Sequence, residues 1–485
     1  MLTTFTAPAF AKTWYIENGD ITISAGKTEG TNKVSQGSTT DEEDTDTVIT
    51  NNNRDTASSH TVTIDAGNDK VEVTLKDVNI KADSGSALTS NGDVTLTLKG
   101  ENHLTGGNGD IYGGDGITSS GSLTISGGTV TATGGNNTGS DGSGGSGIYS
   151  VSGSVTISGG TVNATGGEGS KNNSTSGGSG IYSDSGDVTI SGGTVNANGG
   201  NGGTISGGDG ICSSGGVTIS SGSTVTANGG SGEDGSGGRG ITSNGGVTVS
   251  GGTVNAKGGS GKNGNGGDGI LSFNPVAISG GTVKSNGGSG NLSGGNGIIS
   301  YDIDLSGSLE LTAKAGSPNG KALSRAGKEL DLNTIKDKLG PGAKVTVTDA
   351  NGKVNQVSIP RPVEPEEPVI PEESSSSSDG GSATPSAPVS PLPGLTVTDK
   401  DGQRISYTST RNGNTLTVCV GRFTASFRIS LAALRQLRAE GIETITFQTI
   451  LCSTTLSVDE LLAMGGEDAE AVLTHRFTDS SLTVG

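Results

Sequence analysis

The chain has 485 residues, of which 89 are glycine, a formal net charge of −19 and only 3% aromatic residues. Collagen is excluded because the glycines do not fall at every third position and proline is scarce. The acidic balance argues against nucleic acid as the main partner. A chain this poor in large apolar residues is either disordered or a repeat protein, and its periodicity has to separate the two.

The N-terminus resembles the end of a secretory signal. Residues 1–11 finish in Ala9-Phe10-Ala11, a small-x-small cleavage pattern that precedes a polar start at Lys12. We interpret residues 1–11 as a signal-peptide remnant, which predicts a secreted or cell-surface protein. No later stretch approaches 18 apolar residues, so we expect no transmembrane helix.

Residues 12–59 contain an acidic run from Asp41 to Asp46, which we interpret as a solvated segment. Beyond it, residues 61–64 and 71–75 alternate in polarity as strands do. Because the open end of a parallel stack can pair with other chains, we expect residues 12–59 to cap the repeat that follows.

An internal repeat occupies the middle of the chain. Each full unit reads approximately GGxGIxS, a short turn, VTISGGTVNA, and then a glycine pair with a variable Gly/Ser/Asn insert. Such self-similarity is typical of solenoid architectures. The isoleucine after Gly-x-Gly recurs every 28 to 33 residues, at Ile117, Ile148, Ile181, Ile211, Ile241, Ile270 and Ile298, with degenerate copies at Leu88 and Leu323.

The spacing within a unit predicts its geometry. Val155 and Ile157 share one face of a short strand, whereas Val162 is five residues beyond Ile157 and would fall on the opposite face of a straight strand. A corner at residues 158–160 resolves this conflict, because glycine tolerates the backbone conformation of a corner. With a third strand at residues 147–150, three strands and three corners make one coil.

Stacked coils of this kind form a parallel β-helix, in which each unit buries its apolar face against its neighbours. We predict an all-β fold with a right-handed parallel β-helix of about nine rungs over residues 60–358. The inserts should be flexible and should project from one side of the rod.

The composition changes after the repeat. Nine of the 13 prolines lie between residues 360 and 393, which predicts a linker over residues 359–394. Residues 395–485 are expected to form a small α+β domain. Its elements are a hairpin turning at Asn412-Gly413, a helix from Ser430 to Gly441, a strand over residues 443–449 and a second helix starting at Ser457.

Three cysteines are too few for a disulfide scaffold. Cys212 is expected to be a free thiol, and a bridge between Cys419 and Cys452 is left open. The three histidines are scattered along the chain, so the sequence indicates no zinc site.

Three aspartates are candidate calcium ligands. Asp115, Asp209 and Asp268 occupy the x of GGxGI, where carboxylates and glycine carbonyls could supply oxygens to Ca²⁺. The alternative is that they are solvated turn acids, since other copies carry Ser, Arg or Asn at this position.

Two outward columns offer candidate carbohydrate contacts. Tyr149 and Tyr182 follow the anchor isoleucine on adjacent rungs and could form an aromatic strip for a sugar ring, although rung stacking alone also explains the pair. Asn163, Asn196 and Asn255 stand in a second column, where they either bind glycan hydroxyls or simply face solvent.

Catalysis has little support. Residues 105–300 contain five basic residues and no histidine, and Glu233, Asp234 and Arg239 lie in a glycine-rich insert that would position them poorly. We therefore expect a protein that is not an enzyme.

The units GGSGIYSVSGSVTISGGTVNATGG (144–167) and GGDGICSSGGVTISSGSTVTANGG (207–230) resemble those of a known family. This family comprises secreted, non-catalytic carbohydrate-binding β-helix proteins of clostridial and related gut Firmicutes, with a fold similar to that of pectate lyases. The resemblance spans roughly residues 60–330. It implies binding of cell-wall polysaccharide, including acidic sugars, with calcium as an assisting ion at Asp115, Asp209 and Asp268. The long inserts and uneven aspartates depart from the family pattern.

Together these features predict a secreted protein that binds extracellular polysaccharide or acts in adhesion. The alternative is a structural rod that presents the C-terminal domain, and a polysaccharide lyase is the least favoured interpretation. The oligomeric state is left open.

Overall fold

The computed structural model describes residues 11–171, 173–360, 394–399, 403–405, 407–420, 424–449, 453–465, 469–475 and 480–484. The chain divides into two compact units, residues 1–364 and 365–485. Only about 6% of it is helical. The predicted signal-peptide remnant and linker lie almost entirely outside the described residues.

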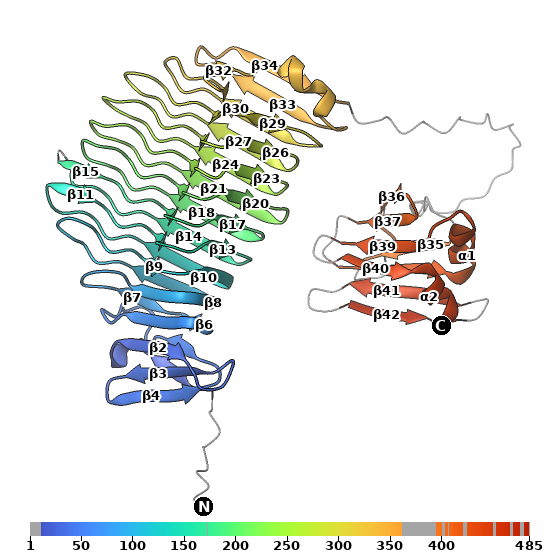
Figure 1. Cartoon of the computed structure of the whole chain (residues 1–485), viewed down its shortest axis with the longest axis horizontal. Helices are drawn as coiled ribbons and strands as arrows, with labels where there is room; N and C mark the ends of the chain where they lie inside the picture. Colours follow the sequence, from blue (N-terminus) through green and yellow to red (C-terminus); the bar gives the residue numbers. More distant parts are fainter. Residues whose placement is uncertain are drawn as a thin grey trace, which may run out of the picture. The chain divides into compact units, whose positions relative to one another are not determined.

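The first unit is a parallel β-solenoid of about 12 turns (Figure 1). Three stacks of short parallel strands run along it, as predicted. The first stack contains β9 (Ile117–Ser119), β12 (Ile148–Ser150), β16 (Ile181–Ser183), β19 (Ile211–Ser213), β22 (Ile241–Ser243), β25 (Ile270–Ser272), β28 (Ile298–Ser300) and β31 (Leu323–Arg325). The second contains β13 (Val155–Ile157), β17 (Val188–Ile190), β20 (Val217–Ile219), β23 (Val247–Val249), β26 (Val276–Ile278) and β29 (Ile303–Leu305). The third contains β14 (Thr161–Thr165), β18 (Gly193–Asn198), β21 (Ser223–Asn228), β24 (Thr253–Lys257), β27 (Thr282–Asn286), β30 (Glu310–Lys314) and β33 (Lys344–Thr348).

Further strands, several of them longer, extend these stacks toward the N-terminus, and they explain why the predicted number of about nine rungs was too low. They are β2 (Ile21–Ala25), β5 (Val48–Thr50), β6 (Val62–Lys76), β7 (Asn79–Lys81), β8 (Leu88–Thr105) and β10 (Leu123–Thr133). Ile21 and Val62 occupy the anchor column in register with Leu88, but no Gly-x-Gly precedes them. The first coil therefore lies within residues 12–59, the segment predicted to be only a cap. The right-handed sense of the coil stays a prediction.

The core is a narrow interior filled by columns of apolar side chains that all three strand stacks supply. Ile148, Ile157, Val162 and Ala164 are fully buried, and each pairs in register with its equivalent in the next coil. The predicted corner is confirmed at Gly160, whose φ is +77°.

A column of buried serines runs beside the isoleucine anchors, and no role was assigned to it from the sequence. It consists of Ser90, Ser119, Ser150, Ser183, Ser213, Ser243, Ser272 and Ser300. Its Oγ atoms lie within hydrogen-bond distance of carbonyls at the adjacent corners, so they tie one coil to the next. Ser243 Oγ, for example, is 2.9 Å from the Gly215 oxygen and 2.8 Å from the Gly246 oxygen. Ser90 is the exception, because its buried Oγ has no hydrogen-bond partner.

This difference gives a matched pair of variants. Ser243→Ala should lower the free energy of unfolding by about 1 kcal/mol, since it removes a donor from buried corner carbonyls. Ser90→Ala should leave stability unchanged or raise it slightly, because it removes a buried hydroxyl that has no partner. Urea unfolding followed by circular dichroism measures both, and equal losses would contradict this account of the column.

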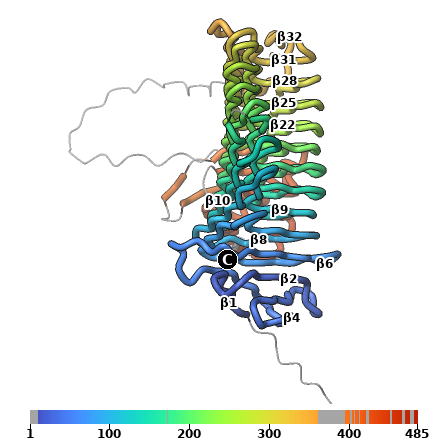
Figure 2. The backbone as a smooth tube through the Cα atoms, turned by 90° about the vertical axis from the view of Figure 1, so that its left-hand side faces the viewer, coloured from blue at the N-terminus to red at the C-terminus, as the bar shows by residue number. Residues whose placement is uncertain are grey.

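The described residues of the inserts pair from coil to coil, which corrects the expectation that the inserts are flexible. The glycine pairs before and after each insert lie side by side, and fifteen successive N–H···O bonds of 2.7–2.9 Å connect them in a zigzag from Gly85 to Gly316. A Cβ on Gly178 would lie 1.9 Å from the Gly145 oxygen, so only glycine fits there. We call this array the glycine ladder, and successive inserts run beside it in parallel (Figure 2).

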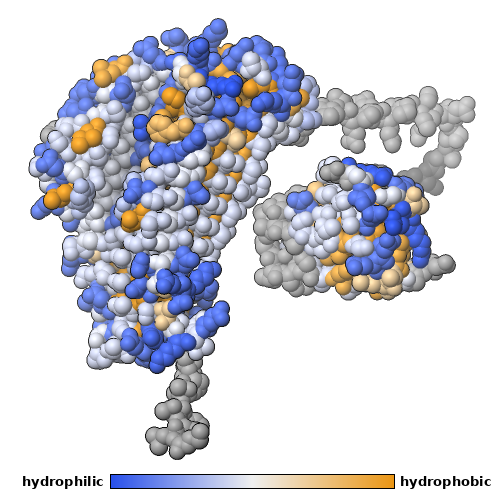
Figure 3. Space-filling model, viewed as in Figure 1, coloured by the Kyte–Doolittle hydropathy of each residue, from blue (hydrophilic) through white to orange (hydrophobic). Residues whose placement is uncertain are grey.

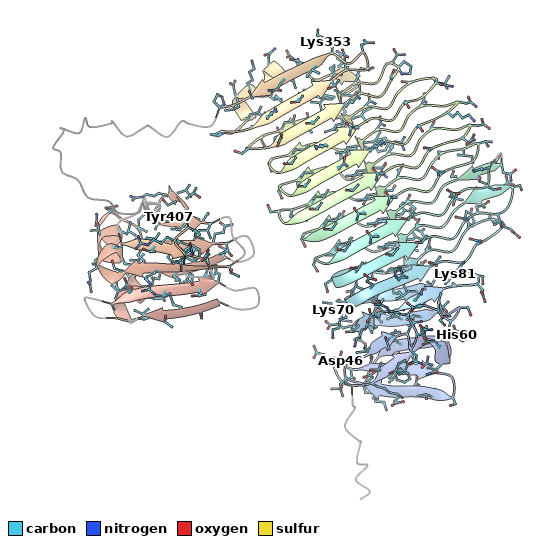
Figure 4. The ribbon with its side chains drawn as sticks, turned by 180° about the vertical axis from the view of Figure 1, so that it is seen from behind. Asp46, His60, Lys70, Lys81, Lys353 and Tyr407 are labelled. Atoms are coloured by element: carbon cyan, nitrogen blue, oxygen red, sulfur yellow. The ribbon has the colours of Figure 1, made fainter. Side chains whose placement is uncertain are left out.

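Both ends of the solenoid carry antiparallel strands. At the N-terminal end these are β3 (Asn32–Gln36) and β4 (Thr39–Asp44), beside β1 (Thr13–Tyr15) and the 3₁₀ turn η1 (Ile16–Asn18). At the other end they are β32 (Lys328–Glu329) and β34 (Val354–Ser358), with the 3₁₀ helix η2 (Leu332–Lys338). Asp46 and Lys353 mark these two ends in Figure 4.

The acidic run of the N-terminal cap is not simply solvated. Asp44 is fully buried, where it accepts hydrogen bonds from Trp14 Nε1 at 2.7 Å and from the Lys12 backbone nitrogen at 3.1 Å. Glu42 pairs with Lys12 Nζ at 2.6 Å. Two side chains of the acidic run, Asp44 and Glu42, therefore stabilise the cap.

The described residues of the second unit form two four-stranded sheets and two helices, and the elements predicted from its sequence are confirmed. One sheet has the order β35 (Leu395–Thr398), β38 (Ala425–Ser430), β41 (Glu470–His475) and β42 (Ser480–Val484). The other has the order β36 (Thr408–Asn412), β37 (Thr415–Cys419), β39 (Thr444–Gln448) and β40 (Ser453–Ser457). Ser430 and Ser457 cap α1 (Leu431–Ala439) and α2 (Val458–Ala463). Cys419 is a free thiol, and Cys452 lies outside the described residues.

Candidate functional site

The two tyrosines of the first stack lie on adjacent coils, as their register predicts. The rings of Tyr149 and Tyr182 stack with centroids 5.2 Å apart and planes at 17°. The Tyr182 hydroxyl donates to Asp184 at 2.6 Å, and burial together with this bond raises the pKa of the phenol. Because one face of each ring covers the other, the pair stabilises the stack, and its role in sugar binding stays a prediction.

The asparagine candidates belong to the third stack. Asn196 Nδ2 donates to Asn163 Oδ1 at 2.8 Å, while Asn255 pairs in register with Thr226 and Lys284. The tyrosines project from one stack and the asparagines from another, with the apolar interior between them. The structure therefore does not bring the two sets into one site.

The three aspartates each bind the backbone of the next coil. Oδ1 of Asp115 accepts from the Ser146 nitrogen at 2.6 Å, and Oδ1 of Asp209 accepts from the Arg239 nitrogen at 2.7 Å. Asp268 does the same with Asn296 at 2.6 Å. This arrangement makes the aspartates links between coils.

Their separation along the rod bears on the calcium prediction. Asp209 and Asp268 are two coils apart, and Arg239 lies between them with its Nε 3.6 Å from an oxygen of Asp268. Among the described residues, no group of three or more Asp, Glu, His or Cys side chains is placed to hold a metal ion. Calcium binding stays a prediction.

Asp209 gives a pH-dependent prediction. Burial raises its pKa above the usual 3.8, so the stability it contributes is present below that pH and is lost as pH rises through the folded-state pKa. Asp209→Asn should therefore unfold at higher urea than the wild type at pH 7 in chelator, and the difference should vanish near pH 3. Asp69→Asn, at an exposed position of β6, is the control. An Asp209→Asn variant less stable than wild type at pH 7 would contradict the assignment.

The inserts form a concave surface, a groove of about 830 Å³. One wall is a column of polar side chains, each directly after a glycine pair or its Ala-Gly equivalent, and we call it the polar column. It consists of Glu168, Asn201, Ser231, Ser260, Ser289 and Ser317. Over five coil spacings the column is about 24 Å long. The groove floor contains the paired backbones of Gly202, Gly232, Gly261 and Gly290.

The polar column was missed in the sequence because the inserts were interpreted as flexible. Aligning the residue that follows the second glycine of each pair would have found it. Its members contact one another across coils, with Ser231 N 2.9 Å from Asn201 Oδ1 and the hydroxyls of Ser231 and Ser260 3.1 Å apart. The column thus presents hydroxyl and amide groups at one-coil spacing.

A second groove of about 820 Å³ shares the polar column from Ser231 onward and is bordered by Lys257 and Lys314. With Lys284, these lysines project from three successive coils of the third stack and are exposed. None of the three has a carboxylate within ion-pair distance in the described part of the chain. This side of the acidic protein therefore carries unpaired positive charge.

The acidic and basic residues considered for catalysis are engaged with other partners. Glu233 pairs with Lys262 at 2.6 Å and Asp234 accepts from Asn263 at 2.6 Å, both at the tip of an insert. The visible surface of the solenoid is mixed, with isolated hydrophobic residues among hydrophilic ones (Figure 3).

Comparison with protein-family models, with curated proteins and with solved structures gives no match. The structure itself shows a β-solenoid. Because no comparison finds a match, membership of the carbohydrate-binding family stays a prediction. Within the described residues, no helix is long and apolar enough to span a membrane.

Proposed function

We propose that this chain is a secreted or cell-surface protein, without enzymatic activity, that binds an extracellular polysaccharide or acts in adhesion. The observation that carries the proposal is the groove along the inserts. It is elongated along the rod axis, it has a backbone floor, and the polar column lines it at regular spacing. A linear polymer of hydroxylated units fits such a groove better than a compact ligand does, because equivalent contacts repeat coil after coil.

Acidic sugars are favoured within this class by the lysines. Lys257, Lys284 and Lys314 could attract carboxylates of a polyuronate directly, and salt should weaken this attraction. Calcium at Asp115, Asp209 and Asp268 is a second proposed route to the same ligand, and a chelator would abolish it.

The test is depletion of the full chain from solution by insoluble cellulose, xylan and pectin, with and without chelator and at low and high salt. The triple variant Asn201→Ala/Ser231→Ala/Ser260→Ala should lose on the order of tenfold or more in affinity, from three hydrogen-bonding groups. The matched control is Thr194→Ala/Thr224→Ala/Thr253→Ala, which alters the third stack of the same three coils. No binding by wild type to any of the three glycans would overturn the proposal.

A structural rod is the second candidate, and the glycine ladder favours it. Continuous hydrogen bonding from Gly85 to Gly316 gives the solenoid a stiff spine suited to holding the second unit at a distance. On this alternative, deleting whole coils would impair function while the triple variant of the polar column would not.

A further inference from the structure

Two aromatic side chains stand out on the solenoid because they are exposed and lie on neighbouring coils. The exposed fraction is 65% for Phe273 and 76% for Tyr301. Each follows the buried serine of its strand, and Ser272 and Ser300 pair in register, so the two side chains leave the backbone on adjacent coils, about 4.8 Å apart along the axis. Neither ring stacks on another aromatic ring among the described residues, in contrast to Tyr149 and Tyr182.

The positions around them are also apolar. Leu271 and Ile299 point outward from β25 and β28, two residues before the rings, and are half-buried. In the preceding coil the same two positions hold Thr242 and Asn244. Relative to that coil, the sequence replaces polar residues by an apolar step of four side chains, and contiguous exposed apolar surface is where ligands and partners bind.

Planar polar groups border the step. Arg325 Nε pairs with Asp302 Oδ1 at 2.8 Å, and both side chains stay about half exposed. Asn274 follows Phe273 directly, and its Nδ2 donates to the Asn244 oxygen. Carboxylate, guanidinium and amide groups can each hydrogen-bond a pair of neighbouring hydroxyls.

The size of the step decides what can cover it. Four side chains on two coils fall far short of the roughly 800 Å² that each partner buries in a stable protein–protein interface. They match instead one or two rings of a small or linear ligand, with an apolar face against the aromatics and polar edges toward the rim.

We propose that Phe273 and Tyr301 form a stacking platform for pyranose rings of a neutral β-1,4-linked glycan of the glucan or xylan type. Equatorial hydroxyls leave C–H groups on both faces of such a ring, so one face lies on the aromatic side chains while the hydroxyls reach Asn274, Asp302 and Arg325. The inference rests on the proposed function and adds a second site to it, on a different stack from the lysines.

The experiment uses the full chain with xylohexaose, cellohexaose and hexagalacturonate in isothermal titration calorimetry. Phe273→Ala and Tyr301→Ala should each weaken binding of a neutral hexasaccharide by roughly tenfold. Phe273→Tyr and Tyr301→Phe should retain affinity, since they keep the ring. Tyr112→Ala, which removes a ring of 70% exposure from an insert, is the matched control and should change nothing.

The outcomes separate this inference from the proposed function. The platform would be overturned if the variant with both Phe273→Ala and Tyr301→Ala bound neutral hexasaccharides with unchanged affinity. It would also be overturned if the wild type bound hexagalacturonate alone. The proposed polysaccharide binding would stand in both cases. Binding of none of the three sugars, together with no depletion by insoluble glycans, would overturn both.

Discussion

Gly238→Ala is expected to lower the free energy of unfolding by about 3 kcal/mol or more, a large effect for the addition of one methyl group. Its Cβ would lie 1.9 Å from the Gly208 oxygen, far inside van der Waals contact. The same residue donates to the Gly230 oxygen and accepts from the Gly259 nitrogen, both at 2.8 Å. Relief of the overlap therefore requires moving a backbone that is bonded on both sides, and the disturbance spreads to neighbouring coils.

Gly159→Ala is the matched control in the same repeat. No atom lies within 4 Å of a Cβ built there, and its φ lies outside the left-handed region. Alanine should leave stability unchanged or raise it by about 0.4–1 kcal/mol through the unfolded chain. Urea unfolding by circular dichroism compares the two variants. Equal midpoints would show that the ladder does not require glycine.

The sequence predicted the three strand stacks because their information is local and repeated. Val155, Ile157 and Val162 could be assigned to one interior from spacing alone, and the corner at Gly160 followed from the conflict between them. The C-terminal helices were equally accessible, since Ser430 and Ser457 are N-caps of the ordinary kind.

The inserts could not be predicted in the same way, because glycine has no side chain whose polarity would reveal a pattern. Gly178, for example, donates to the Gly167 oxygen and lies against the Gly145 oxygen of the preceding coil. Neither contact can be read from the residues next to Gly178 in the sequence. The polar column was missed because the inserts were interpreted as flexible, although aligning the residue after each glycine pair would have revealed it. The candidate site was therefore predicted only in part: Tyr149 and Tyr182 were placed on adjacent coils, but the groove and the exposed pair Phe273 and Tyr301 emerge only from the stacked structure.

Trp14→Ala should lower the free energy of unfolding of the N-terminal cap by about 3–5 kcal/mol, the usual cost of removing a buried tryptophan side chain. Trp14 is 3% exposed, and Lys12 Nζ lies 4.0 Å from its ring centroid. Its indole N–H is one of three donors to the buried Asp44 carboxylate, and its bond is the shortest of the three. Alanine would thus leave a cavity and withdraw a partner from a buried charge at once.

Loss of the cap should also change the association state of the protein. The outermost strand, β4, carries Asp41, Glu42 and Glu43, and charged side chains on an edge strand discourage pairing with other chains. When the cap opens, the strand edges of β2 and β6 become available, so Trp14→Ala should form oligomers at micromolar concentration in sedimentation velocity experiments. Trp14→Phe keeps most of the ring volume and should keep the association state of the wild type, with an intermediate loss of stability. A monomeric Trp14→Ala protein with an unchanged urea midpoint would show that the acidic strand protects the solenoid without the tryptophan. The cap would then depend on backbone pairing between β3 and β4 alone.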